Sequence, residues 1–97
     1  MKIILILAGF IMLASCTATP EAGFSYSPKE PTAGEMVRFT NRSVNTTSSE
    51  WDFGDGITSS HTSTNHIYEE AGFYTVTLKA QKGSSSDTKT VTIEVFP

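Results

Sequence analysis

The C-terminal half of the chain alternates apolar and polar residues with a period of two. Residues 73–80 show this alternation most clearly, and residues 88–95 repeat it. Such alternation is typical of β-strands with one buried face. The intervening residues, 82–87, are rich in Ser, so we expect a hairpin loop and an antiparallel strand pair. The residues expected on the inner faces are Tyr74, Val76, Leu78 and Ala80 in the first strand and Val91, Ile93 and Val95 in the second.

Shorter alternating segments precede this pair. We expect strands at 24–27, 35–40 and 50–53, a weak edge strand or loop at 57–64, and a short segment at 65–68 that leads into a turn. Gly-containing turns at 54–56 and 69–72 separate them, and no segment after residue 22 shows a convincing helical period. This pattern predicts an all-β sandwich of about seven antiparallel strands. The aromatic residues expected at the centre of its core are Phe39, Trp51, Phe53 and Tyr74.

The N-terminus has a different pattern. Lys2 is followed by an apolar run, residues 3–14, that is shorter than the roughly 20 residues a membrane-spanning helix needs. This is typical of a secretory signal peptide. The run ends in Leu13-Ala14-Ser15-Cys16, which resembles a bacterial lipobox. That resemblance implies removal of residues 1–15 and attachment of lipid to Cys16. The alternative is an ordinary signal peptide that happens to contain a Cys. Residues 16–22 would then be the lipidated Cys and a short flexible tether, followed by one domain over residues 23–97.

Composition and charge exclude several classes of protein. The chain has 7 Lys and Arg against 10 Asp and Glu, without a basic cluster, so we expect no nucleic-acid partner. Its single Cys excludes an internal disulfide and a Cys-based zinc site. Since the surface is mildly acidic, the lipid on Cys16 and not surface charge would hold the protein in its membrane.

Two sequence blocks carry a family resemblance. Residues 51–56 read Trp-Asp-Phe-Gly-Asp-Gly, and residues 66–78 contain His-x-Tyr followed by Gly-x-Tyr-x-Val-x-Leu. Together with an aromatic strand and a Pro…Gly segment at 24–34, they resemble the PKD (polycystic kidney disease) domain over residues 23–96. The resemblance implies an immunoglobulin-like sandwich in which Val76 and Phe39 pack where antibody domains have a disulfide. The structural motif residues that it implies are Trp51, Asp52, Phe53, Gly54, Asp55, Gly56, His66, Tyr68, Gly72 and Tyr74.

Few residues suggest a catalytic or metal-binding role. Asp52 and Asp55 flank a Gly-rich turn, where carboxylates accept backbone hydrogen bonds. A calcium site is the alternative, but calcium takes six to eight oxygen ligands and the segment offers two carboxylates. We expect His66 to be packed or hydrogen-bonded and His61 to be solvated. No Gly-x-Ser-x-Gly elbow or phosphate-binding loop is present in the sequence, so we expect neither an enzyme nor a cofactor.

The resemblance implies contacts with protein or carbohydrate. The candidate surface is the Ser/Thr-rich segment 58–64 with 45–49 alongside, and Phe73 and Tyr26 are the aromatic candidates. The alternative is that these segments are solvated loops. We expect a lipid-anchored protein of a bacterial cell envelope, in the outer membrane on its periplasmic or surface face, with an unidentified protein or glycan partner. The competing interpretation is a structural spacer or assembly factor without a ligand of its own.

Overall fold

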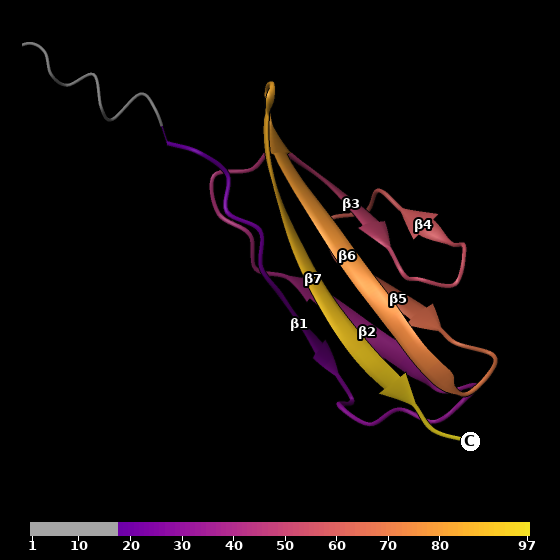
Figure 1. The fold of residues 1–97 in the computed structure, drawn as a ribbon. Coiled ribbons are helices and arrows are strands. Elements are labelled where there is room, and N and C mark those ends of the chain that lie inside the picture. The colour runs from indigo at the N-terminus through magenta and orange to yellow at the C-terminus, as the bar shows by residue number, and fades with distance from the viewer. Residues whose placement is uncertain (1–17) are drawn as a thin grey trace, which may run out of the picture.

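The structure is a computed structural model that describes residues 18–97. Its strands form two antiparallel sheets (Figure 1). The three-stranded sheet has the order β1 (Phe24–Ser27), β2 (Met36–Asn41), β5 (Thr64–Ile67). The four-stranded sheet has the order β4 (Thr58–Ser59), β3 (Ser48–Asp52), β6 (Gly72–Lys82), β7 (Ser85–Val95). Nowhere in residues 18–97 does an apolar helix of bilayer-spanning length occur. The predicted all-β sandwich of seven strands is confirmed.

The long hairpin of β6 and β7 follows the predicted alternation. Val76, Leu78 and Ala80 are fully buried, and Ile93 and Val95 are nearly so. The predicted loop over 82–87 is wrong, because β6 continues to Lys82 and pairs there with Ser85. Gly83 has a φ of 62°, and such a left-handed residue allows a two-residue turn to close the hairpin. Hairpin pairing therefore extends through residues that composition alone marked as loop.

The core lies between the sheets and is centred on aromatic rings. Trp51 is fully buried, with its ring centroid 5.1 Å from that of Phe24 and 5.5 Å from that of Phe39. Val76 and Phe39 are both fully buried, as the resemblance implied. Tyr74, expected at the centre, is only partly buried. Tyr68 is 1% exposed and is the large core residue that the alternation did not indicate. The buried cluster consists of Val37, Phe39, Trp51, Phe53, Tyr68, Val76, Leu78, Ile93 and Val95.

The segment before β1 is fixed to the sandwich. Pro20 is buried, and Glu21 exchanges two backbone hydrogen bonds with Val44, each 2.9 Å long. The Ala22 N–H donates to the Asp87 carboxylate at 2.8 Å. The flexible tether predicted over 17–22 is therefore wrong for residues 20–22, because Pro20 is buried and backbone groups of Glu21 and Ala22 are paired with the domain. Cys16 and the predicted signal peptide lie outside the described residues.

Strand β7 forms an edge of the four-stranded sheet. Its inner face is apolar from Val91 onward, but Lys89 occupies the position opposite the buried Leu78. Lys89 lies on the same face of β7 as the inward-facing Val91, but its side chain is exposed. Near the C-terminal end of β7, Phe96 pairs in parallel with Thr32. The edge of β7 is thus covered by the Thr32 segment near its C-terminal end, and it carries the Lys89 charge further from that end.

Candidate functional site

The turn after β3 is built by the two carboxylates of the Trp-Asp-Phe-Gly-Asp-Gly motif. Asp52 Oδ1 accepts a hydrogen bond from the Gly54 N–H at 2.9 Å, and Asp55 Oδ1 accepts one from the Ile57 N–H at 3.2 Å. The Phe53 N–H closes the turn by donating to the Ile57 carbonyl oxygen at 3.1 Å. The structural interpretation of both carboxylates is therefore supported by their contacts.

Gly54 brings this turn against β6. Its φ is +84°, and an added Cβ would lie 2.5 Å from the Thr75 carbonyl oxygen and 2.9 Å from the Thr75 nitrogen. Real Cβ atoms do not approach backbone so closely, so only glycine fits. Gly56, with a φ of +91°, has nothing within 4 Å of the same position. The two glycines of the motif thus have different roles: one permits close backbone contact and the other only a left-handed turn.

His66 links the turn to β5. Its Nε2 lies 2.6 Å from Asp55 Oδ2, and the side chains of His66 and Asp55 are 8% and 19% exposed. The imidazole stacks on Phe53, with centroids 4.2 Å apart and planes at 5°, and meets Tyr68 edge-on at 4.6 Å. The prediction of a packed, hydrogen-bonded His66 is confirmed. His61 is exposed, as expected.

Two tyrosines complete the motif. The Tyr68 hydroxyl donates to the Phe53 carbonyl oxygen at 2.8 Å inside the core. Burial, with a smaller contribution from the nearby Asp55 carboxylate, raises the pKa of Tyr68 far above its usual range. The Tyr74 hydroxyl donates to the Glu70 carbonyl oxygen at 2.8 Å, which closes the turn before Gly72. The Tyr68 and Tyr74 rings lie 4.3 Å apart. These contacts make the motif mainly a scaffold.

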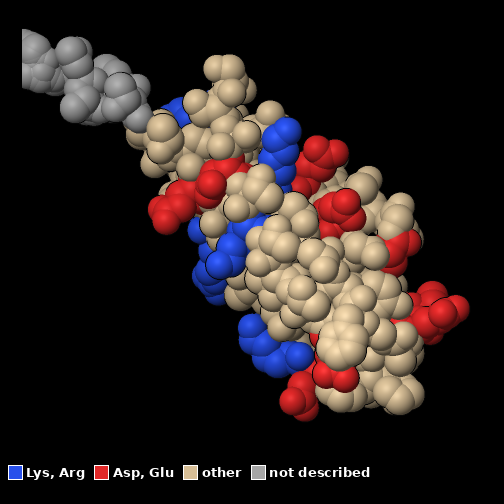
Figure 2. Space-filling view, viewed as in Figure 1, with Lys and Arg blue, Asp and Glu red and all other residues tan. Residues whose placement is uncertain are grey.

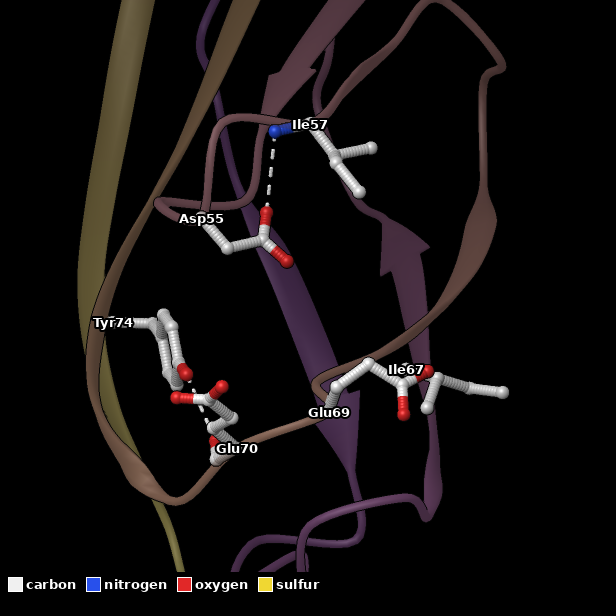
Figure 3. A pocket seen from close by; sticks show the side chains of 6 residues that line it. All are labelled: Asp55, Ile57, Ile67, Glu69, Glu70 and Tyr74. Carbon is white, nitrogen blue, oxygen red and sulfur yellow. Dashed lines mark hydrogen bonds between the residues drawn. The ribbon is translucent and has the colours of Figure 1, made fainter.

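A shallow pocket of about 490 Å³ lies beside this scaffold (Figure 3). Asp55 and Ile57 reach it from the turn, Ile67 from the end of β5, and Tyr74 from β6. Its remaining lining residues are Glu69 and Glu70. The pocket therefore combines two aliphatic side chains and one aromatic ring with three carboxylates. Among residues 18–97, no group of three or more acidic, His or Cys side chains is arranged to hold a metal ion.

Exposed apolar residues gather around this pocket. Ile57 and Ile67 are 52% and 39% exposed, and Met36, the cross-strand partner of Ile67, is 52% exposed. Phe73 is 72% exposed, but it alternates with Tyr74 along β6 and therefore lies on the outer face of that strand and not in the pocket. We call the surface formed by Met36, Ile57, Ile67 and residues 69–74 the pocket end. Exposed apolar side chains beside a pocket are a candidate interaction surface, whereas single exposed apolar residues are common.

The outer face of β6 and β7 carries rows of threonine. Thr75 lies opposite Thr92 and Thr77 opposite Thr90, with hydroxyl oxygens 3.4 Å apart in each pair. Phe73 stands at the end of this row. Figure 2 shows that the middle of this face is largely uncharged, with basic side chains mostly along one edge and acidic ones mostly along the other.

Some of the other predicted surface residues form contacts within the domain, although segment 58–64 is mostly exposed. In segment 45–49, the Thr46 hydroxyl donates to the Gln81 carbonyl oxygen at 2.9 Å. In segment 58–64, the His61 carbonyl oxygen accepts from Trp51 Nε1 at 3.0 Å. Lys29 Nζ lies 4.0 Å from the centroid of the Tyr26 ring, so that face of the ring is covered. Of the two aromatic candidates, Phe73 is the exposed one.

Sequence reasoning missed the side chains that line the pocket. Ile57 and Ile67 are isolated apolar residues in polar surroundings, and Glu69 and Glu70 were considered only as part of a turn. One feature of the sequence could have indicated the pocket. Ile57 and Ile67 are aliphatic residues in an otherwise polar stretch, and the strand pattern gives neither of them a place in the core. The structure brings these residues together with Asp55 and Tyr74, because β5 ends next to the turn that follows β3.

Comparison with known proteins identifies relatives of this fold. A family model described as PKD domain matches residues 17–96. Collagenase ColA of Bacillus cereus is 44% identical over 50 residues, which are 48% of this chain and 5% of the collagenase. The chain thus spans only a small part of this curated relative.

Two solved structures have similar folds. The PKD1 domain of the Vibrio cholerae metalloprotease PrtV is 33% identical with a TM-score of 0.70, covering 82% of this chain and all of that domain. A structure described as the basis for the promiscuous specificity of carbohydrate-binding modules of the β-sandwich superfamily is 31% identical with a TM-score of 0.77. That match covers 81% of this chain and 35% of the other.

Proposed function

The chain belongs to the PKD domain family, a family of non-catalytic modules. We propose that it is a binding module and that a lipid anchors it in a bacterial cell envelope. In this proposal Cys16 carries the lipid and the pocket end contacts a partner outside the membrane. The observation that carries the binding role is the gathering of exposed apolar residues and carboxylates at the pocket end.

The anchoring half of the proposal is supported by sequence. The apolar run over 3–14 ends in the lipobox-like residues before Cys16, which is the single Cys of the chain. Two or three acyl chains retain a protein firmly, because each buried methylene adds about 0.8 kcal/mol. We expect Cys16→Ser to move the protein from the membrane fraction to the soluble fraction. A variant that remains membrane-bound would contradict the anchoring.

The pocket end favours a protein partner that presents apolar and basic side chains. Ile57, Ile67 and Met36 supply exposed aliphatic surface, while Glu69 and Glu70 supply negative charge beside it. Charge complementarity at the rim directs association, and the apolar centre contributes affinity.

Pull-down from detergent-solubilised membranes tests this role. We expect a stoichiometric partner with the unmodified chain and its loss with the Ile57→Ser, Ile67→Ser double variant. Val44→Ser is the matched control, since Val44 is as exposed as Ile57, at 52%, but lies at the other end of the sandwich. Equal loss in both variants would argue against the pocket end as the binding surface.

Carbohydrate binding is the second candidate, favoured by Phe73. An aromatic ring that is 72% exposed beside rows of threonine hydroxyls can stack on a sugar ring while the hydroxyls form hydrogen bonds. The fold similarity to carbohydrate-binding modules adds support. Retention on a glycan array that is lost in Phe73→Ala would establish this candidate. If neither a protein partner nor a glycan is retained, the results would favour a structural spacer without a ligand of its own.

A further inference from the structure

The N-terminal segment is attached to one particular end of the sandwich. We call this the hairpin end, formed by residues 42–47 and by the β6–β7 turn region, 82–87. Figure 1 shows the chain entering there, while its C-terminus and the start of β6 lie at the opposite end. Any anchor upstream of residue 18 therefore pulls on the hairpin end.

The attachment involves the connection between β2 and β3 and also strand β7. Glu21 pairs with Val44 through two backbone hydrogen bonds, and the Asn45 side chain donates to the Thr19 carbonyl oxygen at 3.3 Å. On the other side, Asp87 of β7 accepts from the Ala22 N–H at 2.8 Å. Because the segment is held from two directions, it cannot swing as a free linker does. The pairing continues into Gly23, whose carbonyl oxygen accepts from the Arg42 N–H at 2.7 Å.

The distance to the proposed lipid is short. Only Thr17, Ala18 and Thr19 separate Cys16 from the buried Pro20. An extended chain advances at most about 3.6 Å per residue, so Cys16 lies within roughly 14 Å of Pro20. By contrast, β6 is 11 residues long, which at about 3.3 Å per residue places the two ends of the sandwich on the order of 35 Å apart. The domain is thus much longer than its connection to the membrane.

We propose that the docked residues 19–23 hold the sandwich so that its hairpin end faces the lipid surface and its pocket end points away from it. This orientation rests on the proposed lipid on Cys16 and goes beyond it, since a lipid anchor alone does not fix which face is presented. Val44, the large exposed apolar residue of the hairpin end, lies beside Glu21 and faces the lipid headgroups. The pocket end is then the part of the surface that a partner from outside can reach.

Quenching by spin-labelled lipid headgroups tests the orientation. The processed protein, which begins at lipidated Cys16, is placed in phosphatidylcholine vesicles that contain a nitroxide-headgroup lipid. A fluorophore is attached to a single new thiol, either Ser84→Cys at the hairpin end or Ala71→Cys at the pocket end, both at exposed positions. The thioether blocks Cys16, so only the new thiol reacts. We expect at least threefold stronger quenching at position 84 than at position 71.

A second pair of variants tests the mechanism. Asn45→Ala with Asp87→Ala removes two of the side-chain contacts that hold residues 19–22, and it should narrow the difference between the two label positions. Equal quenching at 84 and 71 in the unmodified background, or stronger quenching at 71, would overturn the orientation while leaving the anchor intact. Failure of the protein to float with the vesicles would overturn the proposed anchoring, and the orientation with it.

Discussion

Gly54 gives the sharpest test of how the motif turn is held against β6. Replacing it with Ala adds one methyl group at a φ of +84° and places that group 2.5 Å from the Thr75 carbonyl oxygen. The left-handed conformation alone costs an L-residue about 1–2 kcal/mol. The clash adds about 1–3 kcal/mol, because backbone on both sides must move to relieve it. We therefore expect Gly54→Ala to lower the free energy of unfolding by about 2–5 kcal/mol.

The same turn supplies a matched control. Gly56→Ala has the same conformational penalty, since its φ is +91°, but its Cβ would meet nothing within 4 Å. Gly34, with a φ of +86° and open space around it, is a second control. Both should lose about 1–2 kcal/mol. A difference of about 2 kcal/mol corresponds to roughly 8–16 °C in Tm for a domain of this size.

Urea unfolding followed by fluorescence measures this difference directly. Trp51 is the single Trp of the chain and is fully buried, so its emission reports on the core. The slopes of the transitions should agree between variants, so that a difference in midpoint reports a difference in stability. If Gly54→Ala and Gly56→Ala lose the same free energy within about 0.5 kcal/mol, the close approach to Thr75 does not explain the glycine at 54.

Four further predictions concern the core and the turn. Trp51→Ala removes the fluorophore, so its urea unfolding is followed by circular dichroism. It should lower the free energy of unfolding by about 3–5 kcal/mol, because it empties a fully buried site and leaves two carbonyl oxygens without a donor. Tyr68→Phe should cost about 1–3 kcal/mol through the unpaired Phe53 carbonyl. Burial raises the pKa of Tyr68 in the folded protein, so above about pH 10 this tyrosine ionises first in the unfolded chain. The unmodified protein should therefore lose stability as the pH rises above about 10. Thermal melts at alkaline pH should show a weaker loss of stability for Tyr68→Phe. Excess calcium and chelator should give the same Tm, and stabilisation by calcium would revive the metal hypothesis for Asp52 and Asp55.

The strands could be predicted from sequence where one face is buried. Alternation placed the inner residues of β6 and β7 correctly, because burial of every second side chain determines register. It failed at the hairpin loop, where Ser and Gly composition suggested irregular structure. A strand that extends beyond the sandwich needs no apolar residues to remain paired, since backbone hydrogen bonds to β6 continue as far as Ser85.

The candidate site was less predictable than the fold. The roles of Asp52 and Asp55 followed from local turn chemistry, which depends on neighbours in sequence. The contact between Asp55 and His66 joins the turn after β3 to strand β5 of the other sheet, so nothing in the local pattern indicated it. The same holds for the pairing of Glu21 with Val44. Polar composition before β1 suggested a free linker, whereas the backbone there finds partners that are distant in the chain.

Lys89 has a consequence for how copies of the chain coexist. An edge strand as long as β7 offers unpaired backbone groups to which another strand could add. A second copy that paired there would have to bury the Lys89 ammonium group against its own apolar residues, without a compensating partner. The inward-facing charge therefore opposes growth of the sheet from one molecule into the next. If the proposed lipid anchor crowds copies of the chain together, this charge opposes one route by which separate folded units could join into aggregates.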